Sequence, residues 1–300
     1  MIWMYTAKGN EFTAADVTSI KQLMDVAKDQ WVWVDIYNPD RKESTIILEL
    51  LGNEPEFAEK VEKRVTSPLS IHKGCVLCDY EKVQDCICLT IPSISLEEQF
   101  LSYPIVLVKK KKVFITWGEE DGAHSKLIKL TIRRLRELVE EGEKPNSALA
   151  ISMLLREIAI NNSELILAVR ERIDQMEEQA LENGGKQLVQ SVFLLKKIIS
   201  SIYRVMINEK EFMLDVDTKI IPRIKLDEKA KSIVDEAIEI IDRELDFIDS
   251  HTRTLDSILT LQDLASIHKV ESSINYLTIV LVIGTAILVI LEILGALEIV

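Results

Sequence analysis

The last third of the chain contains the feature that most restricts its fold, a helix signal that continues into a long apolar run. No proline follows Pro222, so one helix is predicted from about Ile224 to the end of the 300 residues. At ~1.5 Å per residue this helix would measure on the order of 110 Å. Because no domain folds around a lone rod of that length, we expect a stalk that packs against copies of itself or against other helices of the chain.

The apolar run predicts a membrane-spanning helix. Residues 274–291 are apolar except for Asn275, Thr278, Gly284 and Thr285. A span needs roughly 20 residues to cross ~30 Å of hydrocarbon, and Leu277–Ala296 meets that requirement. The alternative is a core helix of a soluble protein, but core helices rarely stay apolar on all sides for so long. We therefore predict one transmembrane helix within residues 274–300, and the sequence contains no second span.

The predicted stalk, residues 223–273, has a seven-residue apolar period that is typical of a seam between helices. One series of seam positions is Val234, Ile241, Ile248, Leu255 and Gln262. The companion series is Ile238, Leu245, Thr252, Leu259 and Ser266. A parallel homo-oligomer would bury this seam, and so would a helical hairpin of the same chain. The period alone leaves both interpretations open.

Composition narrows the class of protein. The formal net charge of −13 disfavours nucleic acid and attracts cations. The N-terminus lacks a basic region followed by an apolar one, so no signal peptide is expected and the part before the membrane should be cytoplasmic. We find no Gly-rich phosphate loop, nucleophile elbow or HExxH motif, and the four histidines form no cluster. These observations predict a protein that is not an enzyme.

Residues 1–122 predict an α/β domain. Short runs rich in β-branched and aromatic residues predict strands at 31–37 and at 86–91, the second ending before Pro92. Two further runs, at 105–108 and 113–117, flank four consecutive lysines, Lys109–Lys112, and predict a hairpin. The lysines could bind phosphates or lipid headgroups, although we favour a solvated turn.

Residues 123–222 predict a helical region with a long antiparallel hairpin. Asn146 and Ser147 are suited to cap a helix that continues to Glu182, and residues 183–185 (Asn-Gly-Gly) end it. A second helix is predicted from Lys186 to about Asp217. The expected fold class is an α+β cytoplasmic domain, this hairpin, and a stalk helix that continues into one C-terminal transmembrane helix.

This order of elements resembles the CorA family of divalent cation transporters over essentially the whole chain. Trp-Val-Asp-Ile-Tyr-Asn-Pro at 33–39 is similar to the W-[IV]-D-x-x-[DN]-P strand end of that family. Residues 172–178 (Arg-Ile-Asp-Gln-Met-Glu-Glu) are similar to its ID.LEE helix, and Leu277-Thr278 resembles the opening of its first transmembrane helix. The resemblance implies a homopentamer in the lipid bilayer that transports Mg²⁺, with Co²⁺ and Ni²⁺ as further candidates.

The chain departs from the family pattern at the end of the transmembrane helix. The family signature Tyr-Gly-Met-Asn falls on residues 294–297 (Leu-Gly-Ala-Leu), where only Gly295 matches. The usual mid-helix proline falls at about Ile287, so its kink should be absent. The second transmembrane helix of the family has no counterpart in the sequence.

Four oxygen-bearing residues spaced seven apart are the candidate pore-lining set, namely Glu271, Thr278, Thr285 and Glu292. In a parallel oligomer they would form stacked rings of the oxygen ligands that hard cations prefer. An acid at membrane depth costs ~2.5–3.5 kcal/mol on insertion scales, so Glu292 should face water, a partner or an ion. The alternative for Glu292 is a position among the far headgroups.

The resemblance also implies a regulatory metal site between the N-terminal domain and the stalk of a neighbour. By alignment its carboxylates would be Glu97, Glu98, Asp235 and Glu236. A bound divalent cation would relieve the repulsion among these acids. The alternative is a solvated acidic face of the stalk.

The cysteines Cys75, Cys78, Cys86 and Cys88, with His72 nearby, could hold tetrahedral zinc. Cys86 and Cys88 fall on one face of a predicted strand, where small apolar residues are ordinary core. We therefore favour core packing over zinc.

Two functions remain from the sequence. The first is a homo-oligomeric channel for divalent cations. The second is a non-conducting relative that acts as a membrane-tethered scaffold, sensor or partner subunit. The lost signature and the missing second transmembrane helix favour the second function, whereas the oxygen-bearing residues at seven-residue spacing and the acidic stalk favour the first.

Overall fold

The computed structural model describes residues 2–8, 11–16, 25–28, 30–37, 43, 45, 47, 69–70, 76–83, 86–96, 100–118, 123–183, 185–222 and 224–297. The chain divides into two compact units. The first comprises Met1–Arg170 and Lys197–Ser250, and the second comprises Glu171–Lys196 and His251–Val300.

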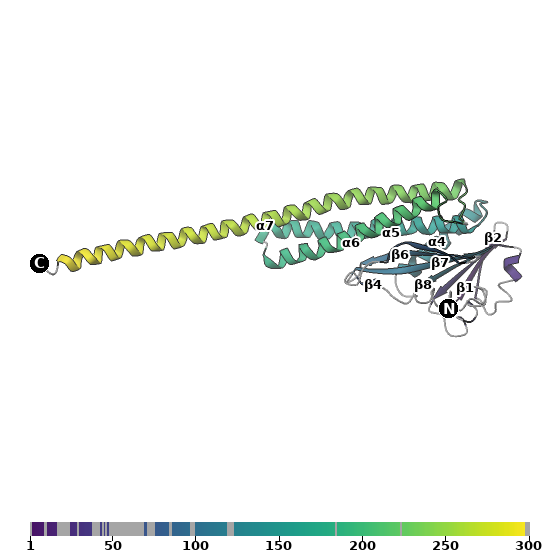
Figure 1. Cartoon of the computed structure of the whole chain (residues 1–300), viewed down its shortest axis with the longest axis horizontal. Coiled ribbons are helices and arrows are strands. Elements are labelled where there is room, and N and C mark those ends of the chain that lie inside the picture. Colours follow the sequence, from purple (N-terminus) through teal and green to yellow (C-terminus); the bar gives the residue numbers. More distant parts are fainter. Residues whose placement is uncertain are drawn as a thin grey trace. The chain divides into compact units, whose positions relative to one another are not determined.

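The described strands of the first unit form one eight-stranded mixed sheet (Figure 1). They are β1 (Ile2–Lys8), β2 (Glu11–Asp16), β3 (Val32–Tyr37), β4 (Leu69–Ser70), β5 (Asp79–Val83), β6 (Cys86–Leu96), β7 (Phe100–Lys110) and β8 (Val113–Gly118). Their order is β2-β1-β3-β8-β7-β6-β5, and β4 also pairs with β7. β3 and β8 are parallel, whereas the other described pairs are antiparallel.

Trp33 and Asp35, two residues of the Trp-Val-Asp motif, lie on the same side of β3 and share one hydrogen-bonded chain. The Trp33 indole nitrogen donates to Thr116 Oγ1 at 2.8 Å, and the Thr116 hydroxyl donates to Asp35 Oδ1 at 2.6 Å. All three residues are buried, and the Trp33 ring meets Phe114 edge-on at 5.4 Å. Because buried polar groups need partners, this chain of bonds explains why the motif combines an indole with a carboxylate.

The sequence-based end of the second strand at Pro92 is wrong, since β6 continues to Leu96. Pro92 lies directly opposite Pro104 of β7, and two prolines can face each other only where a strand pair exchanges no N–H bonds. Pro92 also lies beyond the residues of β6 that pair with β5, and Pro104 lies beyond those of β7 that pair with β8. The missing N–H groups therefore cost the sheet no hydrogen bond in its described pairings.

Four helices follow the sheet: α4 (Ala123–Glu140), α5 (Ser147–Asn183), α6 (Lys186–Asp217) and α7 (Glu228–Leu297). The Asn146 side chain caps α5, because its Oδ1 accepts the Leu149 N–H at 2.8 Å. The hairpin of α5 and α6 matches its prediction to within one residue at the turn. The last helix begins at Glu228, later than the predicted Ile224, because Asp227 Oδ1 accepts the Ala230 N–H at 2.8 Å and so fixes the cap there.

The stalk seam is buried within the chain itself, which decides between the two interpretations of its period. Val234, Ile241 and Leu255 are 0% exposed, and Gln262 is 6% exposed. In the first unit, α7 bonds to α5 through Arg156–Glu236 and to α6 through Lys210–Asp242. In the second unit, the Gln262 side-chain nitrogen donates to the Ala180 carbonyl at 3.3 Å. The companion series is half-buried as far as Leu259, and the side chains of 263–293 are exposed apart from half-buried Gly284.

Candidate functional site

The apolar end of α7 is exposed along its whole length. Its most apolar window has a mean hydropathy of 2.5, and none of that window is buried against the described chain. A core helix would be covered by its own domain, so the core-helix alternative does not fit this surface. α7 is also continuous through Ile287, where the family proline would have interrupted it. Length and composition allow this part of α7 to cross a membrane.

The four predicted pore residues lie along this exposed part of α7. Each of the four side chains, Glu271, Thr278, Thr285 and Glu292, is exposed in the single chain. A seven-residue spacing drifts only ∼20° per step on a straight α-helix, so neighbouring members of the set share one face. Within one chain they form a column of oxygen atoms, and rings would require further copies of α7.

The two threonines use their hydroxyl protons on their own helix. Thr278 Oγ1 donates to the Ile274 carbonyl at 2.8 Å, and Thr285 Oγ1 donates to the Leu281 carbonyl at 2.7 Å. Both hydroxyl oxygens keep lone pairs that can face a cation or its water. This arrangement satisfies the proton of each hydroxyl within the helix, which suits a position next to hydrocarbon.

The acids of the column differ in their surroundings. The carboxylate of Glu271, just before the apolar run, lies 3.3 Å from the imidazole nitrogen Nδ1 of His268. Glu292 lies two turns beyond Thr285, and Gly295 follows in the last turn of α7. A carboxylate at the end of the column can attract cations to it by charge.

The proposed regulatory acids of the stalk are only partly available. Asp235 and Glu236 are both exposed, but Glu236 Oε1 lies 2.9 Å from the Arg156 guanidinium of α5. A metal ion would have to displace Arg156 to use both Glu236 oxygens. Glu97 and Glu98 lie outside the described residues, so their place in such a site stays a prediction.

Some of the predicted zinc ligands lie among the described residues and others lie outside them. Cys86 and Cys88 are buried among the apolar side chains of the sheet, next to Val106 and Val108. Cys75 and His72 lie outside the described residues. Across the described part of the chain, no three residues of the types His, Cys, Asp and Glu form a group that could hold a metal ion.

Sequence reasoning missed a buried polar cluster between α5, α6 and the segment before β5. Asn162 and Glu209 are both 0% exposed and form a 2.6 Å hydrogen bond, and the Cys78 backbone N–H donates to Asn208 Oδ1. Burial raises the pKa of the Glu209 carboxyl well above its usual value, and it does the same to the Cys78 thiol. The sequence does show Asn162 and Glu209 as polar residues on apolar helix faces. Periodicity does not show whether such a residue has a hydrogen-bond partner on the neighbouring helix.

The comparisons with known proteins agree with this architecture. The family described as CorA-like Mg²⁺ transporter protein matches residues 28–287. The chain belongs to this CorA-like family. A comparison with curated proteins gives no match.

Solved structures share the CorA-like fold at low identity. The complete CorA magnesium transporter of Methanocaldococcus jannaschii aligns with a TM-score of 0.71 at 15% identity, covering 93% of this chain and 82% of that one. The full-length CmaX protein aligns with a TM-score of 0.66 at 11% identity, covering 93% and 81%. The cytoplasmic domain of ZntB from Vibrio parahaemolyticus aligns with a TM-score of 0.59 at 11% identity, covering 90% and 98%.

Family membership and the fold class predicted from the sequence are thus confirmed. At these identities the structural likeness shows the fold and not the activity. The CorA-like match ends at residue 287, before Glu292 and before the signature positions around Gly295. Neither the pore-lining role of the four residues nor the regulatory role of the stalk acids is tested by the match.

Proposed function

We propose that this chain transports divalent metal cations, Mg²⁺ first among them, as a homo-oligomeric channel in the cell membrane. In this proposal α7 crosses the bilayer once and the sheet domain lies in the cytoplasm. Five copies, by analogy with the family, surround a pore lined by Glu271, Thr278, Thr285 and Glu292.

One observation gives the channel its strongest support. The exposed apolar part of α7 includes two hydroxyls and a carboxylate at seven-residue spacing, and the carboxylate is costly on a lone lipid-facing helix. Packing these positions against copies of themselves removes the oxygens from lipid and places them around an axis. The net charge of −13 further favours cation entry over anion entry.

The proposed regulatory site completes this function. Mg²⁺ bound by Asp235 and Glu236 of one chain and by Glu97 and Glu98 of its neighbour would stabilise the assembled state. In the single chain Glu236 is paired with Arg156, so metal binding in the assembled protein would have to replace Arg156 by the cation as the partner of Glu236.

A second candidate is a non-conducting CorA-like protein that acts as a membrane-tethered scaffold, sensor or partner subunit. Leu294, Ala296 and Leu297 stand where the family has Tyr, Met and Asn, and they offer no side-chain oxygen to a hydrated cation. In this candidate the chains still assemble, but the end of the helix lacks the side chains that would select a cation.

Ion flux separates the two candidates. Full-length protein is reconstituted into liposomes that contain a Mg²⁺-sensitive dye, and external Mg²⁺ is added. The channel predicts influx above that of empty liposomes, reduced in Glu292→Gln and unchanged in Asp263→Asn, which removes an exposed acid of α7 outside the column. Reconstituted protein that gives no influx would favour the non-conducting relative.

A further inference from the structure

A histidine lies next to Glu271 on the part of α7 just before the apolar run. The imidazole nitrogen Nδ1 of His268 is 3.3 Å from the carboxylate oxygen Oε2 of Glu271, three residues further along the helix. The two side chains are 78% and 64% exposed. An ion pair at such exposure contributes little to stability, so folding of the single chain does not account for this pair.

The separation of the two atoms matches the spacing of two ligands on one metal ion. Zinc binds imidazole nitrogen and carboxylate oxygen at about 2.0–2.2 Å, so two ligand atoms of a tetrahedral site lie roughly 3.4 Å apart. Hydrogen bonds from N–H to oxygen are shorter, at roughly 2.7–3.2 Å. The Nδ1–Oε2 distance of 3.3 Å is therefore close to that of two atoms that share a cation.

Two further side chains with ligand oxygens share this face of α7. Positions 268, 271, 275 and 278 are three, four and three residues apart, so they lie within about 80° of each other around an α-helix. Asn275 and Thr278 supply an amide oxygen and a hydroxyl oxygen, and both side chains are exposed. Lys269, the nearest basic residue in the sequence, is two residues from Glu271 and hence roughly 160° around the helix from it. Ligand atoms, not a lysine, are thus the neighbours of the pair on its face.

The imidazole changes the class of cation that this face would hold. Mg²⁺ prefers oxygen ligands and keeps several waters, whereas imidazole nitrogen suits transition metals such as Zn²⁺, Ni²⁺ and Cu²⁺. One chain supplies too few ligands, since no three residues of the types His, Cys, Asp and Glu form a metal-binding group in the described part of the chain. Zinc takes four ligands, so His268 and Glu271 from each of two chains would complete a site.

We propose that His268 and Glu271 of neighbouring copies of α7 together bind a divalent transition cation at the N-terminal end of the column of oxygen atoms. This site rests on the homo-oligomer of the proposed function and adds to it a distinction between transition metals and Mg²⁺. An ion held across the shared axis lies in the path of Mg²⁺. Transition metals would therefore block the flux that the column supports.

Isothermal titration calorimetry of Zn²⁺ into the full-length, tag-free protein in detergent tests the site without a flux measurement. All proteins have alanine in place of the four native cysteines, which removes thiolates as competing zinc ligands. We expect His268→Gln to weaken zinc binding by roughly tenfold or more, because even the loss of an outer-shell partner costs a metal site that much. His251→Gln, about five turns earlier on α7, is the matched control and should leave zinc affinity unchanged.

Copper provides a second readout if the cysteine-free protein does not fold. Cu²⁺ bound to the protein with its native cysteines should show nitrogen coupling from an imidazole in its electron paramagnetic resonance spectrum. This coupling should be lost in His268→Gln and kept in His251→Gln. A spectrum that is the same in all three proteins overturns the site.

The outcomes separate this site from the proposed channel. Zn²⁺ should inhibit Mg²⁺ influx into proteoliposomes, and half inhibition in His268→Gln should require roughly tenfold more Zn²⁺ or above, in step with the loss of affinity. Zinc binding that depends on His268 in an oligomer without Mg²⁺ influx supports the site and contradicts the channel. Mg²⁺ influx with equal zinc affinity in wild type and His268→Gln supports the channel and overturns the site. A His268-dependent ratio of one zinc ion per chain overturns a site shared between copies, and a monomer that binds no zinc overturns both proposals.

Discussion

Asn162 of α5 donates a 2.6 Å hydrogen bond to Glu209 Oε2 of α6, and both side chains are completely buried. The other oxygens of the pair, Asn162 Oδ1 and Glu209 Oε1, have no hydrogen-bond partner in the described part of the chain. A charged carboxylate in this place would lack compensation, and its desolvation outweighs the Asn162 hydrogen bond in setting its pKa. Glu209 is therefore a proton-binding group in the centre of the helical hairpin.

Glu209→Gln should stabilise the protein at neutral pH. The folded pKa of Glu209 is raised above its unfolded value, so the folded state holds a proton that the unfolded state releases. The contribution of this group to stability is complete below the unfolded pKa of about 4.3 and falls as the pH rises toward the folded pKa. Glutamine does not titrate, so the variant escapes this loss, and its advantage over wild type grows with pH.

Melting temperatures of the detergent-solubilised protein at pH 5, 6 and 7 measure this difference. Within the window between the two pKa values, the gap in unfolding free energy should widen by about 1.4 kcal/mol per pH unit. Glu211→Gln, at an exposed position two residues further along α6, is the matched control and should show no such trend. A Glu209→Gln variant that is less stable than wild type at pH 7 would contradict the prediction.

Arg156→Met should strengthen the stabilisation of the protein by Mg²⁺. The Arg156 guanidinium lies 2.9 Å from Glu236 Oε1, and removing this guanidinium frees the Glu236 carboxylate to bind a cation. Loss of the Arg156–Glu236 pair by itself should lower stability by no more than ~1 kcal/mol. Arg156 also lies 3.1 Å from the buried Glu157 carboxylate, so the variant should lose further stability at that second pair. The measurement is the rise in melting temperature on addition of millimolar Mg²⁺, compared with that of wild type.

Charge reversal at Asp235 and Glu236 provides the opposite test and should abolish the Mg²⁺ shift. A shift that persists in that double variant would place the metal elsewhere or reduce the effect to screening. An Arg156→Met protein with an unchanged shift would remove Glu236 from the ligand set.

Patterns of single residues were enough to predict the long helices and four of the eight described strands, namely β3, β6, β7 and β8. The Asn-Gly-Gly run at 183–185 predicted the end of the first hairpin helix, because such residues end a helix whatever the tertiary context. The observed boundaries are Asn183 for α5 and Lys186 for α6. β8 was predictable in the same way from the β-branched and aromatic run at 113–117. Its parallel pairing with β3 was not, because pairing across about 75 residues depends on the whole sheet.

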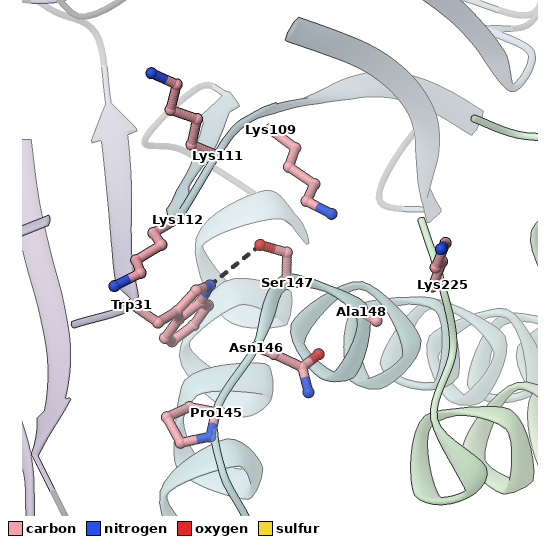
Figure 2. A pocket seen from close by; sticks show the side chains of 9 residues that line it. All are labelled: Trp31, Lys109, Lys111, Lys112, Pro145, Asn146, Ser147, Ala148 and Lys225. Atoms are coloured by element: carbon pink, nitrogen blue, oxygen red, sulfur yellow. Dashed lines mark hydrogen bonds between the residues drawn. The ribbon is translucent and has the colours of Figure 1, made fainter. Parts of the chain in front are cut away.

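The candidate sites show the same difference between what local sequence determines and what only the fold determines. The column from Glu271 to Glu292 could be read from spacing, since residues seven apart on one helix must share a face. The partner of Glu236 could not, because contact with Arg156 depends on the rotation of α7 about its axis against α5. Lys225 and three lysines of the β7–β8 hairpin line one pocket (Figure 2), and the sequence could not predict this, because the two segments meet only after the chain has folded.

The length of α7 that remains attached should control the solubility of a truncated chain. Burial of the stalk seam ends at Gln262, and the next apolar residues, Leu264, Ile267 and Val270, are 50%, 53% and 57% exposed. We expect a chain ended after Gln262 to be soluble without detergent and monomeric. A chain ended after Ser273 should also leave the membrane but associate through these residues. Light scattering coupled to size exclusion measures both, and a monomeric 1–273 chain would contradict this role for the three side chains.

Cysteines at positions 278 and 285 should crosslink between subunits, each introduced separately into a variant without native cysteines. In a parallel oligomer these positions face the shared axis with Glu271 and Glu292. Positions 280 and 287 are the matched controls, because two further residues rotate a side chain by roughly 200° on an α-helix. All four positions are exposed in the single chain, so differences in crosslinking report the packing between copies.

The crosslinks and the flux assay together decide what the column does. Selective crosslinking at 278 and 285, with Mg²⁺ influx that falls in Glu292→Gln, supports a pore, because a ring of carboxylates concentrates cations and a ring of amides does not. Equal crosslinking at 280 and 287 would mean that α7 does not pack in this register. Selective crosslinking without influx in either protein would leave the column a role in assembly alone, since small side chains such as threonine let transmembrane helices pack closely even where no ion passes.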